Sequence, residues 1–152
     1  MNDYLTLCRE AKALISGVDH LTADLANLSA LIFGSLDRIN WAGFYLLTGD
    51  RLILGPFQGK PACIEICVGH GVCGSAVKNN APLLVHDVHR FPGHIACDPE
   101  SRSEIVVPVK KDGVPVAVLD IDSPEVGRFD DHDLEGLEKL VQVIEEELYH
   151  LF

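Results

Sequence analysis

The chain has 152 residues, of which 47% are hydrophobic, and it carries a formal net charge of -11. This length suits one domain with its own core, and we expect a single domain over residues 1–152. The negative charge argues against a nucleic-acid partner, because no basic stripe is present to neutralise phosphates. No apolar run reaches the length needed to cross a bilayer, so a membrane protein is not expected.

The five cysteines do not form the pattern of a disulfide framework. Their number is odd, and the N-terminal segment lacks the apolar core of a secretion signal. We therefore expect a cytoplasmic protein, in which thiols are kept reduced and any disulfide is transient.

The first half of the chain is expected to contain two helices followed by strands. The apolar faces of the helices are Tyr4, Leu7, Ala11 and Leu14 in the first, and Leu21, Leu25, Leu28 and Ile32 in the second. This spacing of three and four residues is helical. A strand at 41–48 turns at Gly49-Asp50 into a strand at 51–57, and a third is expected at 62–68.

The second half adds further strands and a closing helix. The segment GVCGSAVKNN fits a short helix, and a strand follows at 83–87. Strands at 104–110 and 114–122 are joined by Asp112-Gly113, a strong hairpin signal. The last helix begins at about Asp130, and its heptad-like spacing indicates that it faces a sheet or another subunit. Terminal helices around an antiparallel sheet make an α+β domain.

The segment from Val85 to Pro108 places Cys97 in a polar loop after three histidines. A cysteine in an exposed loop near positive charge can act as a thiolate nucleophile. Two further cysteines, Cys63 and Cys73, stand in glycine-rich surroundings. Cys63 follows a flexible lead, whereas Cys73 lies at a predicted helix start, a position that lowers a thiol pKa. One attacking thiol with two candidate partners is typical of a thiol redox enzyme.

Strand alternation predicts which of five further side chains share a face and are candidates for one pocket. Trp41 and Tyr45 share a face of the first strand, and Asp120 and Asp122 share a face of the last, with Glu104 on its neighbour. Carboxylates at the end of a covered strand are costly to desolvate unless a positive group meets them. Two simpler interpretations remain: the carboxylates could end the strand in water, and the aromatic pair could belong to the core.

A zinc site is the alternative use of the cysteine loop. His86, His89, His94 and Cys97 are of the residue types that bind zinc, but their spacing is irregular and no second cysteine pair accompanies them. A simpler role for the histidines is to raise the local positive potential and so favour a thiolate. We therefore expect no metal.

Several motifs resemble the free methionine-(R)-sulfoxide reductases, a family built on one GAF domain. They are INWAGFYLL, GPFQGKPAC, GVCG, VHDVHRFPGHIACD, SEIVVP, VLDIDSP and FDDHD, which together span about residues 39–140. The resemblance implies a central antiparallel sheet with the N- and C-terminal helices on one face and a ligand pocket on the other. It also implies a homodimer that takes its electrons from thioredoxin and needs no bound cofactor.

The resemblance further assigns a role to each candidate residue. Cys97 is the implied nucleophile and Cys63 the implied resolving thiol, with Cys73 as an auxiliary or alternative one. Glu104, Asp120 and Asp122 match the carboxylates that hold the substrate and assist departure of its oxygen. Trp41 and Tyr45 match the aromatic wall around the methyl sulfoxide.

The chemistry of sulfoxide reduction agrees with these residue types. A soft nucleophile attacks sulfur, an acid such as Asp120 protonates the departing oxygen, and the resulting sulfenic acid condenses with a second thiol. Three carboxylates beside a thiolate would raise its pKa, and the ammonium group of a free amino acid relieves this. A GAF-domain sensor without catalysis, in which the cysteines report redox state, remains the alternative function.

Overall fold

The computed structural model describes residues 2–95 and 97–152. Its twelve elements follow one another as α1 (Tyr4–Ile15), α2 (Leu21–Ser35), β1 (Trp41–Thr48), β2 (Arg51–Gly59), β3 (Glu65–Cys67), α3 (Gly71–Asn79), β4 (Leu83–Val85), η1 (Val88–Arg90), β5 (Ser103–Lys111), β6 (Val114–Ser123), α4 (Asp131–Glu147) and η2 (Tyr149–Leu151), where η denotes a short 3₁₀ helix. The α+β class expected from the sequence is confirmed.

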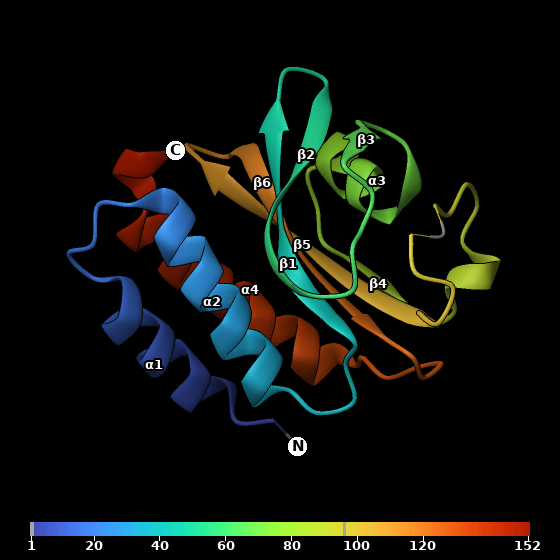
Figure 1. The fold of residues 1–152 in the computed structure, drawn as a ribbon, viewed down its shortest axis with the longest axis horizontal. Coiled ribbons are helices and arrows are strands. Elements are labelled where there is room, and N and C mark those ends of the chain that lie inside the picture. Colours follow the sequence, from blue (N-terminus) through green and yellow to red (C-terminus); the bar gives the residue numbers. More distant parts are fainter. Residues whose placement is uncertain (1, 96) are drawn as a thin grey trace.

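The six strands form one antiparallel sheet in the order β3-β2-β1-β6-β5-β4. β6, whose sequence is apolar on both faces, lies in the middle between β1 and β5, as a covered strand should. The β5–β6 hairpin turns at Asp112 and Gly113, both with positive φ, which is the geometry of a type I′ turn. Long helices cover one face of this sheet, and α3 with the cysteine loop lies over the other (Figure 1).

The helix-side core is built mainly from apolar side chains, although Asp24 and Ser29 of α2 are also buried. α2 and α4 pack on the sheet, and α1 packs on both of them. Buried side chains of the three helices meet those of β1, β5 and β6, among them Leu28, Phe44, Leu119, Leu137 and Ile144. One expectation is wrong: Leu14 is exposed, and Ile15 takes its place on the buried face of α1, because the apolar face turns by one residue at the last turn of the helix.

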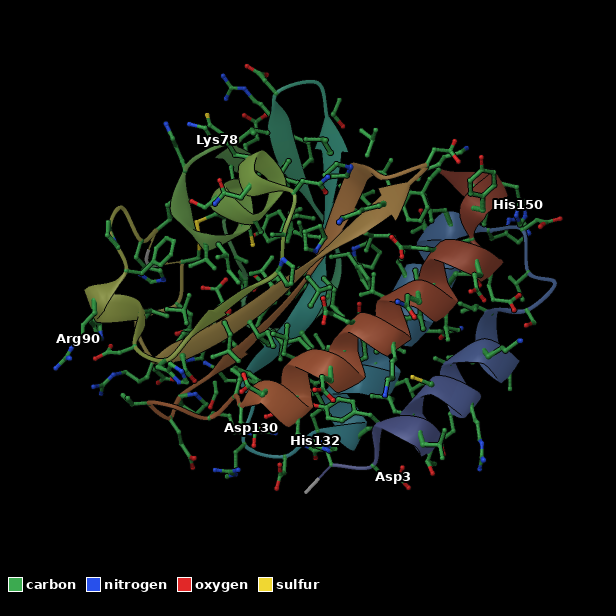
Figure 2. The ribbon with its side chains drawn as sticks, turned by 180° about the vertical axis from the view of Figure 1, so that it is seen from behind. Asp3, Lys78, Arg90, Asp130, His132 and His150 are labelled. Carbon is green, nitrogen blue, oxygen red and sulfur yellow. A yellow bond between two sulfur atoms is a disulfide. The ribbon has the colours of Figure 1, made fainter. Side chains whose placement is uncertain are left out.

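Polar contacts fix the ends of α1 and α4 beside each other. The Asp3 side chain caps α1 by accepting from the Thr6 amide, and Asp130 and Asp133 form a capping box on α4. Asp133 also accepts from the Tyr4 hydroxyl at 2.6 Å, which ties the two helices together. Figure 2 shows Asp3, Asp130 and His132 at this end of the helix pair and His150 at the other.

The heptad-like spacing of the last helix is accounted for within the chain. Leu137, Leu140, Val141 and Ile144 are buried in the helix-side core, so this stripe is directed at the sheet and α1. The helix ends earlier than the stripe suggests, because Leu148 is its C-cap and Leu151 lies in η2.

Candidate active site

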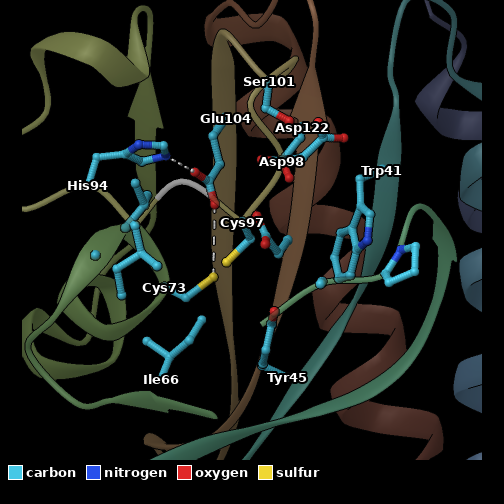
Figure 3. A pocket seen from close by; sticks show the side chains of 16 residues that line it. Trp41, Tyr45, Ile66, Cys73, His94, Cys97, Asp98, Ser101, Glu104 and Asp122 are labelled. Carbon is cyan, nitrogen blue, oxygen red and sulfur yellow. Dashed lines mark hydrogen bonds and ion pairs between the residues drawn. The ribbon is translucent and has the colours of Figure 1, made fainter. Parts of the chain in front are cut away.

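A cavity lies on the face of the sheet opposite the long helices (Figure 3). Strands β1, β5 and β6 form its floor, and α3 and the cysteine loop form its walls. The described residues that line it are Trp41, Tyr45, Pro61, Ala62, Ile66, Gly71, Val72, Cys73, His94, Ile95, Cys97, Asp98, Ser101, Glu104, Asp120 and Asp122. Seven of the eight residues predicted for the site therefore line one cavity, and the eighth, Cys63, is bonded to a member of the lining.

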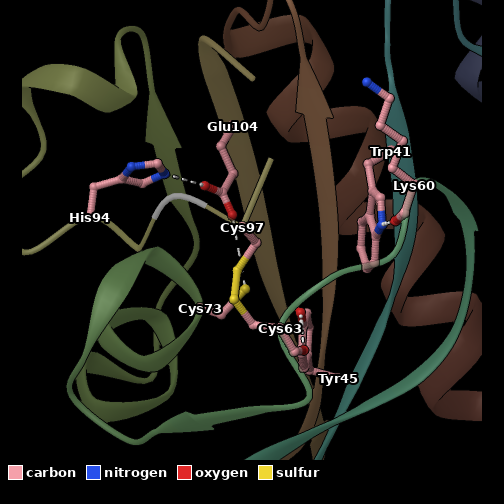
Figure 4. The surroundings of a disulfide bond; sticks show 8 residues. All are labelled: Trp41, Tyr45, Lys60, Cys63, Cys73, His94, Cys97 and Glu104. Carbon is pink, nitrogen blue, oxygen red and sulfur yellow. Dashed lines mark hydrogen bonds and ion pairs between the residues drawn. A yellow bond between two sulfur atoms is a disulfide. The ribbon is translucent and has the colours of Figure 1, made fainter. Parts of the chain in front are cut away.

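A disulfide joins Cys63 to Cys97 at the edge of this cavity (Figure 4). The two residues are 34 positions apart, and their α-carbons lie 5.6 Å from each other, a usual separation for a bridge. The Tyr45 hydroxyl donates to the Cys63 carbonyl at 2.8 Å and so anchors the segment that leads into β3. The bridge is the pairing that the family resemblance implied, and it leaves Cys73 as a free thiol.

Strand register places three carboxyl groups together on the cavity floor. Glu104 on β5 pairs with Asp122 on β6, and Asp120 lies two residues further along β6 beside Val106. Glu104 and Asp120 are 7% and 5% exposed, so the interpretation that the strand simply ends in water fails for them. Removal from water raises the pKa of all three carboxyl groups, and the charge of Asp120 raises those of Glu104 and Asp122 further.

The cavity is thus built for a positive charge that the protein does not itself provide. Its lining contains four carboxyl groups, those of Asp98, Glu104, Asp120 and Asp122, and no lysine or arginine among the described residues. Oδ1 of Asp120 is buried and has no hydrogen-bond partner in the described part of the chain. A buried oxygen of this kind costs about 1–3 kcal/mol until a ligand satisfies it.

Cys73 lies on α3 with its thiol directed at the carboxyl groups. α3 lies close to the preceding strand because Gly74 has no side chain; a β-carbon there would collide with the Cys67 carbonyl. The Cys73 thiol is 3% exposed and donates to Oε1 of Glu104 at 3.9 Å. Burial, followed by the charges of Asp120 and Glu104, raises its pKa well above the ordinary value. The expected lowering at the helix start is wrong, because desolvation outweighs the helix dipole here.

One of the three loop histidines lines the cavity. Nε2 of His94 lies 3.9 Å from Oε2 of Glu104 (Figure 3). Burial lowers the pKa of His94, and His89 lowers it further. The expectation that the histidines supply positive potential is therefore weakened for His94, which is mostly neutral at neutral pH. The ligand set suggested for zinc, His86, His89, His94 and Cys97, does not assemble among the described residues.

The aromatic wall stands on β1. The Trp41 ring stacks on Phe57 at 5.1 Å between centroids and lies 6.0 Å from the Tyr45 ring. Its indole nitrogen donates to the Lys60 carbonyl at 3.1 Å, so the edge of the ring is fixed (Figure 4). Both side chains are buried and both line the cavity, so the aromatic pair belongs to the core and to the wall of the pocket at once.

Sequence reasoning missed Asp98 and Ser101 in the cavity lining. Both belong to the cysteine loop, and the Asn40 amide donates to Asp98 at 3.3 Å and to Ser101 at 3.2 Å. These contacts hold the loop against the start of β1. The charge of Asp98 also contributes to the raised pKa of Asp122. The position of Asp98 next to Cys97 was the one signal that could have revealed it.

Comparison with known proteins places this architecture in a family. A model of the GAF domain matches residues 15–148. The free methionine-R-sulfoxide reductase of Escherichia coli is 53% identical over 145 residues, which is 95% of this chain and 88% of that protein. The chain belongs to the GAF-domain family of free methionine-(R)-sulfoxide reductases.

Solved structures of this reductase family share the fold in detail. The reduced form of the Staphylococcus aureus fRMsr is 53% identical, with a TM-score of 0.94 over 97% of this chain and 96% of that one. The Neisseria meningitidis free methionine-R-sulfoxide reductase in complex with its substrate is 38% identical, with a TM-score of 0.93 over 97% of this chain and 88% of that one. In the described part of this reductase-family chain, every helix is too short or too polar to span a bilayer.

Proposed function

We propose that this protein reduces free methionine-(R)-sulfoxide to methionine. The observation that carries the proposal is the Cys63–Cys97 bridge on a cavity that combines an aromatic wall with unbalanced carboxyl groups. The bridge is the oxidised state of a pair of redox-active thiols, and the carboxyl groups form a site for the ammonium group of a free amino acid. The relatives named as reductases of this compound support the same activity.

The first chemical step takes place at Cys97. Its thiolate attacks the sulfoxide sulfur, the sulfur–oxygen bond breaks, and oxygen is transferred to Cys97 as a sulfenic acid while methionine leaves. The departing oxygen needs a proton, and Asp120, whose raised pKa keeps it protonated at higher pH than an ordinary aspartic acid, is suited to donate it. Sulfur is reduced by two electrons and Cys97 is oxidised by two.

The second step forms the observed bridge. The Cys63 thiol condenses with the Cys97 sulfenic acid, and water is released. Cys73 is less suited to this role, because its thiol is buried, strongly protonated and directed at Glu104. It is positioned to act only if Cys63 is absent.

The substrate is held by charge at one end and by aromatic rings at the other. Glu104 and Asp122 bind the ammonium group, while Trp41 and Tyr45 surround the methyl sulfoxide. In the disulfide form the cavity measures about 40 Å³, enough for about three water molecules and too small for an amino acid. Substrate is therefore expected to bind after the bridge has been reduced, when Cys97 is again a thiol.

Thioredoxin is the proposed reductant and the cytoplasm the proposed compartment. An external dithiol must reach the bridge, and Cys63 is only partly buried beside the exposed Ile64. Cys8, Cys67 and Cys73 are free thiols, which suits a reducing compartment.

A homodimer is proposed through the outer face of α1 and α4. A groove between these helices is lined by Leu5, Cys8 and Val143 together with charged residues of both signs, including Glu135 and Lys139. Leu5 is 65% exposed there, and a two-fold pairing of this face with itself would cover it. Light scattering of the purified protein tests this directly, with Leu5→Glu expected to give monomers.

The activity is tested by a coupled assay with thioredoxin, thioredoxin reductase and NADPH. NADPH should be oxidised with free methionine-(R)-sulfoxide and hardly at all with the S epimer. Stoichiometric binding of the sulfoxide without any turnover would instead establish the sensor alternative. If a chemical dithiol supports turnover and thioredoxin does not, the reductase activity stands and the proposed electron donor is replaced.

A further inference from the structure

Three side chains in the cavity have the composition and arrangement of a metal site. Ligand atoms of Cys73, Glu104 and Asp120 all lie within 4.8 Å of one another, and all three residues are buried. They come from different elements, α3, β5 and β6, which the fold holds rigidly together. Among the described residues, no other group of three or more histidine, cysteine or acidic side chains brings its ligand atoms as close together.

The distances are near those that a tetrahedral zinc ion needs. Sulfur and carboxylate ligands bind zinc at about 2.3 and 2.1 Å, which separates neighbouring ligand atoms by about 3.6 Å. The Cys73 sulfur and Oε1 of Glu104 are already 3.9 Å apart, so a small rotation of either side chain suffices. A carboxylate oxygen of Asp120 provides the third ligand atom. Oδ1 of the same carboxyl group is buried and has no hydrogen-bond partner in the described part of the chain.

We propose that Cys73, Glu104 and Asp120 form a binding site for a zinc ion in the substrate-free protein. One thiolate with two carboxylates leaves a fourth position open to water, as in zinc sites with three protein ligands. The thiolate disfavours magnesium and calcium, which prefer oxygen ligands only.

The size of the cavity favours an ion over the substrate in the disulfide form. A volume of about 40 Å³ accommodates an ion with a bound water but no amino acid. Ile95, which is 37% exposed and lines the same cavity, marks a route from solvent. The ion occupies the place in which the ammonium group of a substrate would bind, and its charge balances the same carboxylates.

Zinc binding would release protons and would also block the enzyme. Zinc binds a thiolate and a carboxylate, so a proton on the Cys73 sulfur or on the Glu104 carboxyl group has to leave when the ion binds. Affinity should therefore rise by about tenfold per pH unit for each proton released. The inhibition, which rests on the proposed function, follows because Glu104 and Asp120 cannot hold zinc and substrate together.

The test uses the protein in its disulfide form, in which Cys63 and Cys97 are unable to bind metal. Zinc is titrated into metal-free protein in competition with a chromophoric chelator, and one ion per chain should bind. Cys73→Ser should lower the affinity at least about 100-fold, beyond the 10- to 100-fold typical of losing an outer contact. The matched controls Cys8→Ser and Cys67→Ser remove free thiols outside the cavity and should change nothing.

Cadmium provides a spectroscopic readout of the same site. Bound cadmium should give an ultraviolet thiolate-to-metal absorption in the wild type that is absent in Cys73→Ser. Asp120→Asn, which retains the thiol, should weaken zinc binding while keeping that absorption at saturating cadmium. This second variant also covers the case in which Cys73→Ser does not fold, which thermal melting would reveal.

Three results would overturn the site: no zinc binding by the disulfide form, equal affinity of wild type and Cys73→Ser, or binding that appears only after the bridge is reduced. The last result would assign the ion to Cys63 and Cys97. Because zinc is measured without sulfoxide, a protein that binds zinc but turns over no substrate would refute the reductase activity alone.

In single-turnover reactions of the reduced protein, zinc should block methionine release and a chelator should restore it.

Discussion

The two faces of the sheet contrast in how closely they bring buried ionisable groups together. On the helix side, apolar residues of α1, α2 and α4 pack against one another and the sheet, and Asp24, Ser29 and Asp133 are the buried polar side chains of these helices in the described part of the chain. On the cavity side, an apolar cluster borders three carboxyl groups and a protonated thiol whose pKa values are all raised by burial. The first face supplies stability, and the second is left short of positive charge so that a ligand can supply it.

The largest expected effect on the cavity face is the loss of turnover in Cys97→Ser. A hydroxyl is a poor nucleophile towards sulfoxide sulfur, so the coupled assay should fall to background. Cys97 is partly exposed, and the free energy of unfolding measured under reducing conditions should hardly change. Full activity in this variant would show that the nucleophile lies elsewhere.

The opposite result is expected on the helix face from Leu137→Ala. Leu137 is fully buried between α4 and the sheet, so the cavity left behind should lower the free energy of unfolding by about 2–5 kcal/mol. The values of kcat and KM at a temperature where the variant is folded should stay near those of the wild type. A large change in KM without a change in denaturation midpoint would contradict the division between the two faces.

Acetylating the amino group of the substrate tests the charge deficit itself. If Glu104 and Asp122 hold the ammonium, its loss should reduce kcat/KM by about ten- to a hundredfold, the equivalent of 1.5–3 kcal/mol. Steady-state kinetics with free and N-acetylated sulfoxide measure the ratio. Equal values for the two substrates would refute this role of the carboxylates.

The smallest effect expected is a gain in stability from Asp120→Asn. The raised pKa means that the folded state holds its proton more tightly than the unfolded state. Stability from this group is therefore complete below about pH 4 and is lost as pH rises through the folded pKa. The variant should gain on the order of 1 kcal/mol at pH 8 and little at pH 4, measured by urea unfolding, while its kcat falls more than its KM rises. A gain that is the same at both pH values would show that burial of charge is not the cause.

Sequence periodicity predicted the strands and their faces better than the loops. β1 begins and ends at the predicted residues, and the hairpin turns at Asp112-Gly113, because strand alternation and turn residues are local signals. The predicted third strand was too long, since β3 is limited to Glu65–Cys67 by its short pairing with β2. Trp41, Tyr45 and the β-strand carboxylates were placed correctly because alternation fixes the face of each side chain.

The walls of the site were harder to predict because loops have no periodicity. Asp98, Ser101 and His94 reach the cavity through loop contacts that no local pattern encodes. The burial of Cys73 likewise depends on how closely α3 approaches the sheet, which only the folded chain determines. Electrostatic consequences such as its raised pKa follow from that packing and could not be inferred beforehand.

The most direct test of the account is a single turnover without external reductant. The reduced protein is mixed with an equal amount of free methionine-(R)-sulfoxide, quenched, and analysed for methionine and by peptide mapping under non-reducing conditions. We predict close to one methionine per chain and one new bridge, between Cys63 and Cys97. Methionine release with a dominant Cys73–Cys97 bridge, or a bridge formed without methionine, would contradict it.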